Sequence, residues 1–107
     1  MLNHQLIRAM KVKKYEKIVS KILLNKFTAR NSDYVLYAFV LLDYGVDINT
    51  LSTKDFLKGL HNKTYPSFEG IGRCRRKLQE NHPEFRGTKW AARHEIQKMV
   101  KEDLNLF

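Results

Sequence analysis

The chain has few of the features that mark a secreted, zinc-binding or membrane-spanning protein. Cys74 is the single cysteine among 107 residues, so no internal disulfide can form and a cysteine-based zinc site has no second sulfur ligand. The apolar runs fall short of the roughly 18 residues that a membrane span requires. The N-terminal segment also lacks the apolar block of a secretory signal. We therefore expect a protein of the cytoplasm.

Catalytic and metal-binding patterns are also missing. The histidines His4, His61, His82 and His94 show no metal-ligand spacing. No arrangement of Ser, His and Asp, or of Cys and His, can be argued from the sequence. The segment GIGRCR lacks the third glycine and the preceding strand of a dinucleotide-binding fingerprint. We expect a protein that is not an enzyme and that uses no cofactor or metal.

Positive charge is abundant and unevenly distributed. The formal net charge is +9, and residues 1–30 hold eight Lys and Arg against Glu16 alone. Residues 58–101 hold eleven basic residues against four acidic ones, whereas residues 31–57 hold one lysine and four aspartates. Such a balance favours a polyanionic partner, chiefly nucleic acid or an anionic surface. The alternative is that the chain is simply one of many basic cytoplasmic proteins.

The spacing of apolar residues predicts an all-α fold of five helices. The first is expected over 11–26, with 2–10 either extending it or fraying. The run 34–44 is apolar on nearly all sides, which is typical of a buried helix, with a buried strand as the rival. Three more helices are expected over 54–61, over 68–81 and from Thr88 to about Leu104. We expect one compact domain spanning 1–107.

Polar residues and glycine mark where these helices should begin and end. Ser52 and Asp55 form a variant of the capping box, flanked by Leu51 and Phe56 at the positions of a hydrophobic staple. The remaining predicted caps and terminators are Asn31 or Ser32, Gly45, Ser67, Pro83 and Thr88. The segment EFRG, 84–87, could form a small wing or a bend.

Residues 68–81 form the most basic predicted helix. A helical wheel places Phe68, Ile71, Cys74 and Leu78 on an inward face, with Arg75 near its edge. Glu69, Arg73, Arg76, Lys77 and Glu80 lie on the outward face, and Gly72 and Gln79 lie on a flank. In the structural interpretation, the outward face is simply a solvated helix surface. Ion pairs at i, i+4 between Glu69 and Arg73 and between Arg76 and Glu80 would stabilise it.

The functional interpretation is a helix-turn-helix at about 54–81. Arg73 and Arg76 would read base edges, since Arg pairs bidentately with guanine, and Lys77 would touch phosphate. Gly70 and Gly72 weaken the helix and permit a close approach, either of a neighbouring helix or of phosphate. The candidate nucleic-acid-binding residues are Arg73, Arg76, Lys77, Arg75, Lys63, Lys58 and Gln79.

Two other residues and one pair carry narrower expectations. Cys74 should be a small core residue, and Trp90 should anchor the core, with base stacking as the less favoured alternative. Arg30 and Asp33, at the entrance of the second helix, should form a local structural pair.

Two segments resemble a known group of proteins. TARNSDYVLY and PSFEGIGRCRRKLQE resemble small proteins encoded by phages and prophages of Gram-positive bacteria, over about residues 12–90. The matching positions are Arg30, Asn31, Ser32 and Asp33, then Ser67, Ile71, Arg73, Arg75, Arg76, Lys77 and Gln79. The resemblance implies a phage setting, hence the cytoplasm of a host cell, and a helical, winged-helix-like fold.

Two classes of function follow as hypotheses. The first is a non-enzymatic protein that binds double-stranded DNA, as a regulator or as an accessory factor in phage replication or recombination. The second is a protein-interaction module that binds and modulates a host protein. RNA is a third ligand to consider, although the chain has no RNP-type or KH-type signature.

Overall fold

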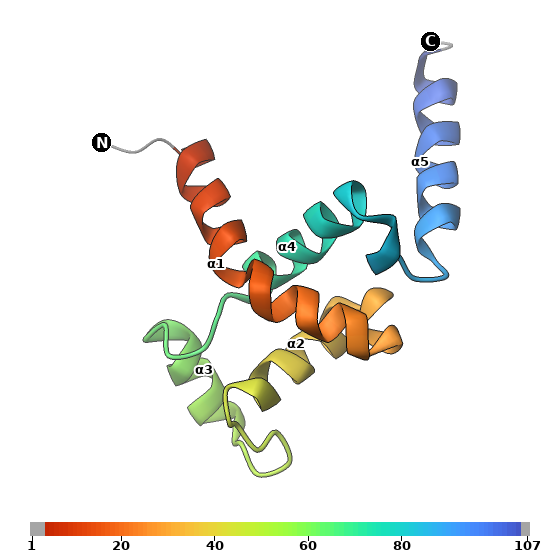
Figure 1. The fold of residues 1–107 in the computed structure, drawn as a ribbon. Coiled ribbons are helices and arrows are strands. Elements are labelled where there is room, and N and C mark those ends of the chain that lie inside the picture. Colours follow the sequence, from red (N-terminus) through yellow and green to blue (C-terminus); the bar gives the residue numbers. More distant parts are fainter. Residues whose placement is uncertain (1–3, 106–107) are drawn as a thin grey trace.

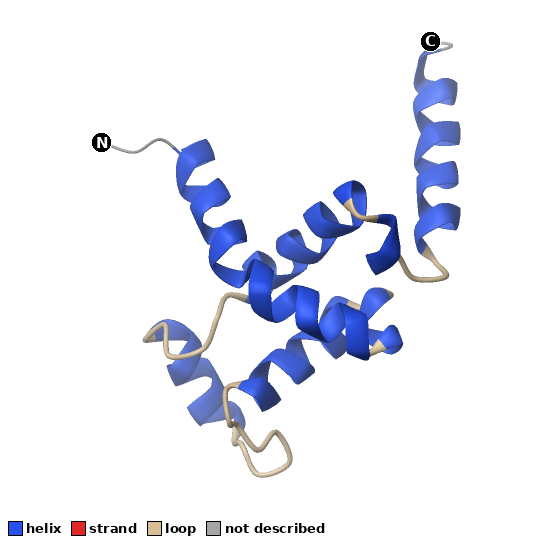
Figure 2. Cartoon of the chain, viewed as in Figure 1, coloured by secondary structure: helices blue, strands red, loops and turns tan. Residues whose placement is uncertain are grey.

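The chain folds into five α-helices and two short 3-10 helices (Figure 1). The computed structural model describes the backbone of residues 4–105 and the side chains of residues 13–100. The elements in chain order are α1 (His4–Asn25), η1 (Phe27–Arg30), α2 (Asp33–Asp43), α3 (Thr53–His61), α4 (Phe68–Asn81), η2 (Pro83–Phe85) and α5 (Trp90–Asn105). The predicted all-α class is thus confirmed, and Figure 2 shows helices and loops only over residues 4–105.

The core forms where α4 packs against both α1 and α2. Val19 and Leu23 of α1, Leu36 of α2, and Ile71 and Cys74 of α4 are fully buried. These positions recur at helical spacing, so each of these three helices turns one apolar stripe inward. Cys74 is a small core residue, as predicted.

Serine hydroxyls begin three of the helices at the predicted positions. The Oγ atoms of Ser32, Ser52 and Ser67 accept hydrogen bonds from the backbone N–H of the residue three positions later, at 3.3, 3.1 and 3.1 Å. Each bond satisfies an N–H that the first helical turn cannot pair internally. Gly45 ends α2 with a φ of +82°, in the left-handed region that glycine adopts most readily.

Aromatic packing attaches α3 to the rest of the molecule. Phe56 of α3 meets Tyr37 of α2 edge-on, with ring centroids 6.2 Å apart, and stacks on Tyr65 at the same distance. Tyr65 lies so close to α3 that a Cβ added to Gly59 would stand 2.3 Å from its ring. The Tyr37 hydroxyl donates to the Pro66 carbonyl oxygen at 2.7 Å, which fixes the turn between α3 and α4.

Helix α5 departs from the predicted compact bundle. It extends away from the other helices (Figure 1), and Ile96, Met99 and Val100 of its apolar face are 52–60% exposed. Thr88 is not its N-cap, because the helix begins two residues further along, at Trp90. Of the two alternatives for EFRG, a wing does not form within residues 4–105, and Pro83–Phe85 make a 3-10 turn instead.

Among the described residues, none of the helices combines the length and the hydropathy needed to cross a bilayer.

The dependence of the free energy of unfolding on pH, in the alkaline range, tests the burial of Cys74 and Tyr37. Desolvation raises the pKa of the Cys74 thiol from 9.0 to about 12, and the pKa of Tyr37 from 10.0 to about 12. Above about pH 9 the unfolded chain therefore binds fewer protons than the folded chain. We expect the free energy of unfolding to fall as the pH rises towards 12, by up to about 1.4 kcal/mol per pH unit for each group.

Urea unfolding of the wild type and of Cys74→Ala between about pH 8 and about pH 11 measures this slope. The variant is less stable throughout but should lose its stability less steeply with pH, because it has no thiol to ionise. Equal slopes for the two proteins would contradict the burial of the thiol.

Candidate nucleic-acid interface

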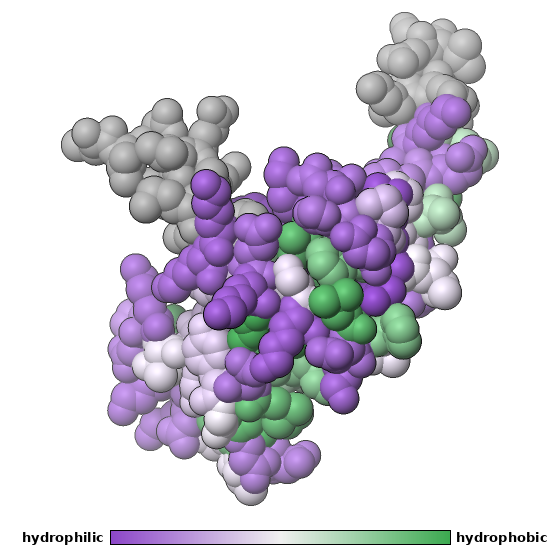
Figure 3. Space-filling view, viewed as in Figure 1, coloured by the Kyte–Doolittle hydropathy of each residue, from purple (hydrophilic) through white to green (hydrophobic). Residues whose placement is uncertain are grey.

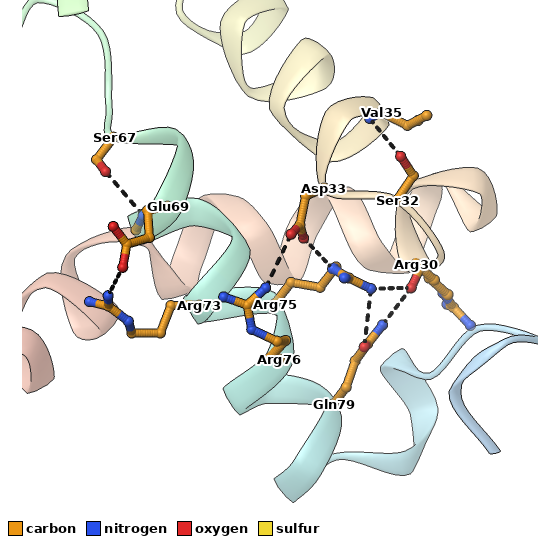
Figure 4. A network of polar contacts seen from close by, with 11 residues as sticks. Arg30, Ser32, Asp33, Val35, Ser67, Glu69, Arg73, Arg75, Arg76 and Gln79 are labelled. Carbon is orange, nitrogen blue, oxygen red and sulfur yellow. Dashed lines mark hydrogen bonds and ion pairs between the residues drawn. The ribbon is translucent and has the colours of Figure 1, made fainter. Parts of the chain in front are cut away.

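The outward face of α4 holds three of the predicted cations. Lys77 is exposed, the side chain of Arg76 is 53% exposed and that of Arg73 is 30% exposed. Arg73 forms the predicted ion pair with Glu69, four residues earlier on the same helix (Figure 4). The predicted pair between Arg76 and Glu80 is not formed, since Arg76 turns to a carboxylate on another helix.

Arg75 was predicted to bind nucleic acid, and the structure corrects this. It is only 3% exposed. Its Nε donates to Oδ1 of Asp33 at 2.8 Å, and its Nη1 donates to the Arg30 carbonyl oxygen at 2.7 Å (Figure 4). A buried guanidinium requires such acceptors, because desolvating an unpaired charge costs several kcal/mol, to order of magnitude. Arg75 therefore joins α4 to η1 and α2 and is not available to a ligand.

Gln79 is corrected for the same reason. It is 2% exposed, and its Nε2 donates to the carbonyl oxygens of Arg30 at 2.8 Å and Phe85 at 3.1 Å. Its Oε1 accepts from Nη1 of Arg75 at 3.4 Å. Both of its amide hydrogens and its oxygen are thus used within the protein. Gln79 completes the internal polar network and fastens η2 to α4.

Asp33 is the acidic centre of this network. Its Oδ1 accepts from Arg75, and its Oδ2 accepts from Nη1 of Arg76 at 3.1 Å. The expected local pair between Arg30 and Asp33 is therefore wrong, because Asp33 pairs with two arginines more than 40 positions later in the chain. Asp33 also opens α2, where the helix dipole favours a negative charge.

The other residues of the segment RNSD have separate structural roles. Nε of Arg30 donates to the Leu23 carbonyl oxygen at 2.7 Å. The Asn31 side chain donates to Oγ1 of Thr88 at 3.2 Å and accepts from the N–H of Lys89 at 3.1 Å. The segments TARNSDYVLY and PSFEGIGRCRRKLQE contact each other through Asp33 and Arg75 and through the Arg30 carbonyl, so most of their polar residues hold the fold together.

The glycines of α4 serve helix packing, which was one of the two expected alternatives. A Cβ added to Gly72 would stand 2.8 Å from Oδ2 of Asp33, and one added to Gly70 would stand 3.1 Å from the ring of Tyr15. Their lack of a side chain lets α2 and α1 approach α4 closely.

The remaining predicted residues lie apart from the network. Lys58 and Lys63 are exposed on α3 and on the turn that follows it. Lys63 has a φ of +60°, so a lysine occupies the left-handed position that glycine usually takes in such turns. Trp90 does not anchor the core; its ring lies between the guanidinium of Arg86, 3.6 Å from the ring centroid, and His94.

The sequence did not single out two residues whose side chains could contact a ligand, Arg86 and Phe27. Arg86 donates to the backbone carbonyls of Gln79 and Glu80, whereas the sequence places it only within the expected wing or bend of EFRG. Phe27 is 70% exposed and carries the guanidinium of Arg30 above its ring. Their only sequence signal is an aromatic close to an arginine in each case, F-T-A-R and R-G-T-K-W. Among the described residues, no His, Cys, Asp and Glu side chains are clustered as a metal ion would need.

Replacement of Asp33 tests the network. We expect Asp33→Ala to lower the free energy of unfolding by about 3 kcal/mol, because it leaves the buried Arg75 without its counter-charge. Glu69→Ala removes a carboxylate from the exposed pair with Arg73 and should cost no more than about 1 kcal/mol. Chemical unfolding of both variants measures the difference, and equal losses would contradict the central role of Asp33.

The chain was compared with models of protein families, with curated proteins and with solved structures, and none of these comparisons found a match.

Proposed function

We propose that this protein binds nucleic acid, with duplex DNA as the preferred ligand, in a non-enzymatic role. The observation that carries the proposal is the net charge of +9 together with the outward face of α4, where Arg73, Arg76 and Lys77 remain at the surface. Clustered cations on one helix face attract the phosphate backbone and release its counterions on binding.

The internal network supports this proposal by fixing the helix that carries the cations. Arg75 and Gln79 hold α4 to η1, so the outward side chains project from a rigid support. A rigid support lowers the entropy lost when the cations engage a ligand. Lys77 is the freest of them, whereas Arg73 and Arg76 are already paired with carboxylates. Phosphate contact by Lys77 and Arg76 is therefore the primary role, and base reading by Arg73 and Arg76 requires their ion pairs to open.

Helix α1 adds a second basic surface. Lys13, Lys14 and Lys17 are exposed, and Lys14 lies over the ring of Tyr15, 5.7 Å from its centroid. The same ring lies against Gly70 in the first turn of α4. Figure 3 shows hydrophilic residues over most of this face of α1 and α4, with smaller apolar patches between them. The two basic segments of the sequence are therefore neighbours at this point.

The finer version of the proposal is a helix-turn-helix made of α3, the turn and α4. In it Lys58 and Lys63 contact phosphates on one side of the groove that α4 enters. A role as regulator or accessory factor in phage replication or recombination belongs to this finer version.

Titration of a labelled random duplex at about 50 mM and about 200 mM salt tests both versions. We expect Arg76→Gln with Lys77→Gln to weaken binding and to reduce the salt slope by about 2, because two phosphate contacts are lost. Lys58→Gln with Lys63→Gln should weaken it comparably if α3 and α4 act as a helix-turn-helix.

The matched control is Lys54→Gln with Lys98→Gln, which removes the same charge elsewhere. If all three double variants bind alike, charge alone accounts for the affinity and α4 has no special role. A wild-type protein without salt-dependent affinity would overturn the proposal altogether.

A protein-interaction module is the second candidate, and α5 favours it. Ile96, Met99 and Val100 expose an apolar face on a helix that extends from the body of the molecule (Figure 1). Exposed apolar faces of this kind are common where a partner protein docks.

Retention of a partner protein from a nuclease-treated lysate tests this candidate. We expect Ile96→Glu with Met99→Glu to abolish the retention without lowering the unfolding temperature, because both side chains are more than half exposed. The nucleic-acid affinity of the variant should be unchanged. A partner that binds wild type and variant equally would show that α5 is not its docking surface.

A further inference from the structure

A hollow of about 310 Å³ lies between η1 and the segment that joins η2 to α5. Its walls include Phe27, Thr28 and Arg30 on one side and Arg86, Gly87 and Thr88 on the other. The two sides are tightly joined, since a Cβ added to Gly87 would stand 2.2 Å from Oδ1 of Asn31 and 2.9 Å from Cβ of Arg30. None of these residues belongs to the outward face of α4.

Two arginines, Arg30 and Arg86, line this hollow, and backbone carbonyls hold the guanidinium group of each in place. Nε of Arg30 donates to the Leu23 carbonyl oxygen at 2.7 Å. Nε and Nη2 of Arg86 donate to the carbonyl oxygens of Gln79 and Glu80 at 2.6 and 3.1 Å. These bonds orient the groups without neutralising them.

Neither charge is balanced by a carboxylate among the described side chains, residues 13–100. The arginines of α4 differ in this respect, since Arg73, Arg75 and Arg76 each pair with Glu69 or Asp33. Two fixed and uncompensated guanidinium groups form a site suited to an anion, above all to phosphate, which matches the planar fork of Arg.

An aromatic ring completes the hollow. Phe27 is 70% exposed, although burying a ring of this size is normally favourable. The Arg30 guanidinium lies 4.4 Å from its centroid. Exposed rings beside arginine are the usual platform on which an unpaired base stacks, because every base presents a flat π-face. Figure 4 shows why the platform is rigid: the Arg30 carbonyl is held by Arg75 and Gln79, while its side chain runs away from Gln79.

We propose that this hollow binds a nucleotide, with the base stacked on Phe27 and the phosphate between Arg30 and Arg86. The volume suits one nucleotide and excludes a duplex, whose bases are stacked on each other and cannot reach the ring. The nucleotide is either free or part of an unpaired strand, because both present the same base and phosphate. The proposal is independent of duplex binding by α4, since it uses other residues and another form of ligand.

Titrations of the whole chain with four probes, followed by backbone amide NMR shifts, test the site. The probes are inorganic phosphate, thymidine monophosphate, a short single-stranded oligothymidine and a fully paired hairpin. We expect oligothymidine to shift the amides of residues 27–31 and 86–88, and to change the fluorescence of Trp90, the only tryptophan, which contacts Arg86. The hairpin should leave these amides unchanged.

Phe27→Leu removes the ring and should weaken oligothymidine binding by about fivefold to a hundredfold, the range measured for stacking of one base. Phe27→Tyr keeps an aromatic face and should restore the affinity. Tyr34→Leu is the matched control, because Tyr34 is another exposed aromatic, at 78%, that does not line the hollow. Hairpin affinity should be the same in all of these proteins.

The outcomes separate the ligand sources and the two proposals. Thymidine monophosphate binding as tightly as the strand supports a free nucleotide, and binding of the strand alone supports unpaired nucleic acid. The proposal is overturned if inorganic phosphate reproduces the whole effect, if Phe27→Leu binds oligothymidine as wild type does, or if the amides of 27–31 and 86–88 do not shift. Failure of hairpin binding with these shifts intact would remove only the duplex proposal.

Discussion

The ion pair between the buried guanidinium of Arg75 and the carboxylate of Asp33 is the interaction on which the rest of the structure depends. Arg75 is only 3% exposed, so its charge must be matched by a carboxylate and by hydrogen-bond acceptors inside the protein. This requirement fixes the groups around it. The end of η1 must present a carbonyl, α2 must begin with an acid, and α4 must have glycine at position 72 to admit that acid. One charged side chain thereby sets the relative positions of three elements.

This constraint divides the basic residues of α4 into two groups with different consequences for function. Arg75 holds the helix and is lost to any ligand, whereas Lys77, Arg76 and part of Arg73 remain at the surface. The net charge of +9 therefore overstates the charge that α4 presents. Arg30 and Arg86, two further arginines without a carboxylate partner among the described side chains, lie away from α4, and backbone carbonyls orient their guanidinium groups without cancelling their charge.

Local signals in the sequence were sufficient to predict where most helices begin and end. They could not predict which side chains from different helices pair with each other. Ser32, Ser52 and Ser67 could be placed as caps because a cap acts over three residues, and Gly45 because its left-handed φ is a property of one residue. The partner of Asp33 lies in a different helix, so proximity in sequence suggested Arg30 instead. The helical wheel places Arg75 at the boundary between the inward and outward faces of α4. Whether a side chain at that boundary is buried depends on the helices packed against it, which the wheel does not include. The apolar stripe of α5 predicted a helix packed against the others, but its residues are exposed. An apolar stripe indicates that a face can be covered and does not identify the element that covers it.

The short helix η1 connects the network to the hollow beside it. Its last carbonyl is gripped by Arg75 and Gln79, and its side chains Phe27 and Arg30 face the other way. Because Gln79 also holds the carbonyl of Phe85, the same residue fixes the segment that carries Arg86. Both walls of the hollow are thus anchored to α4 by one amide group. Arg75 and Gln79, which were expected to touch a ligand, instead position the walls of the hollow, so the geometry of the hollow is a consequence of packing inside the protein.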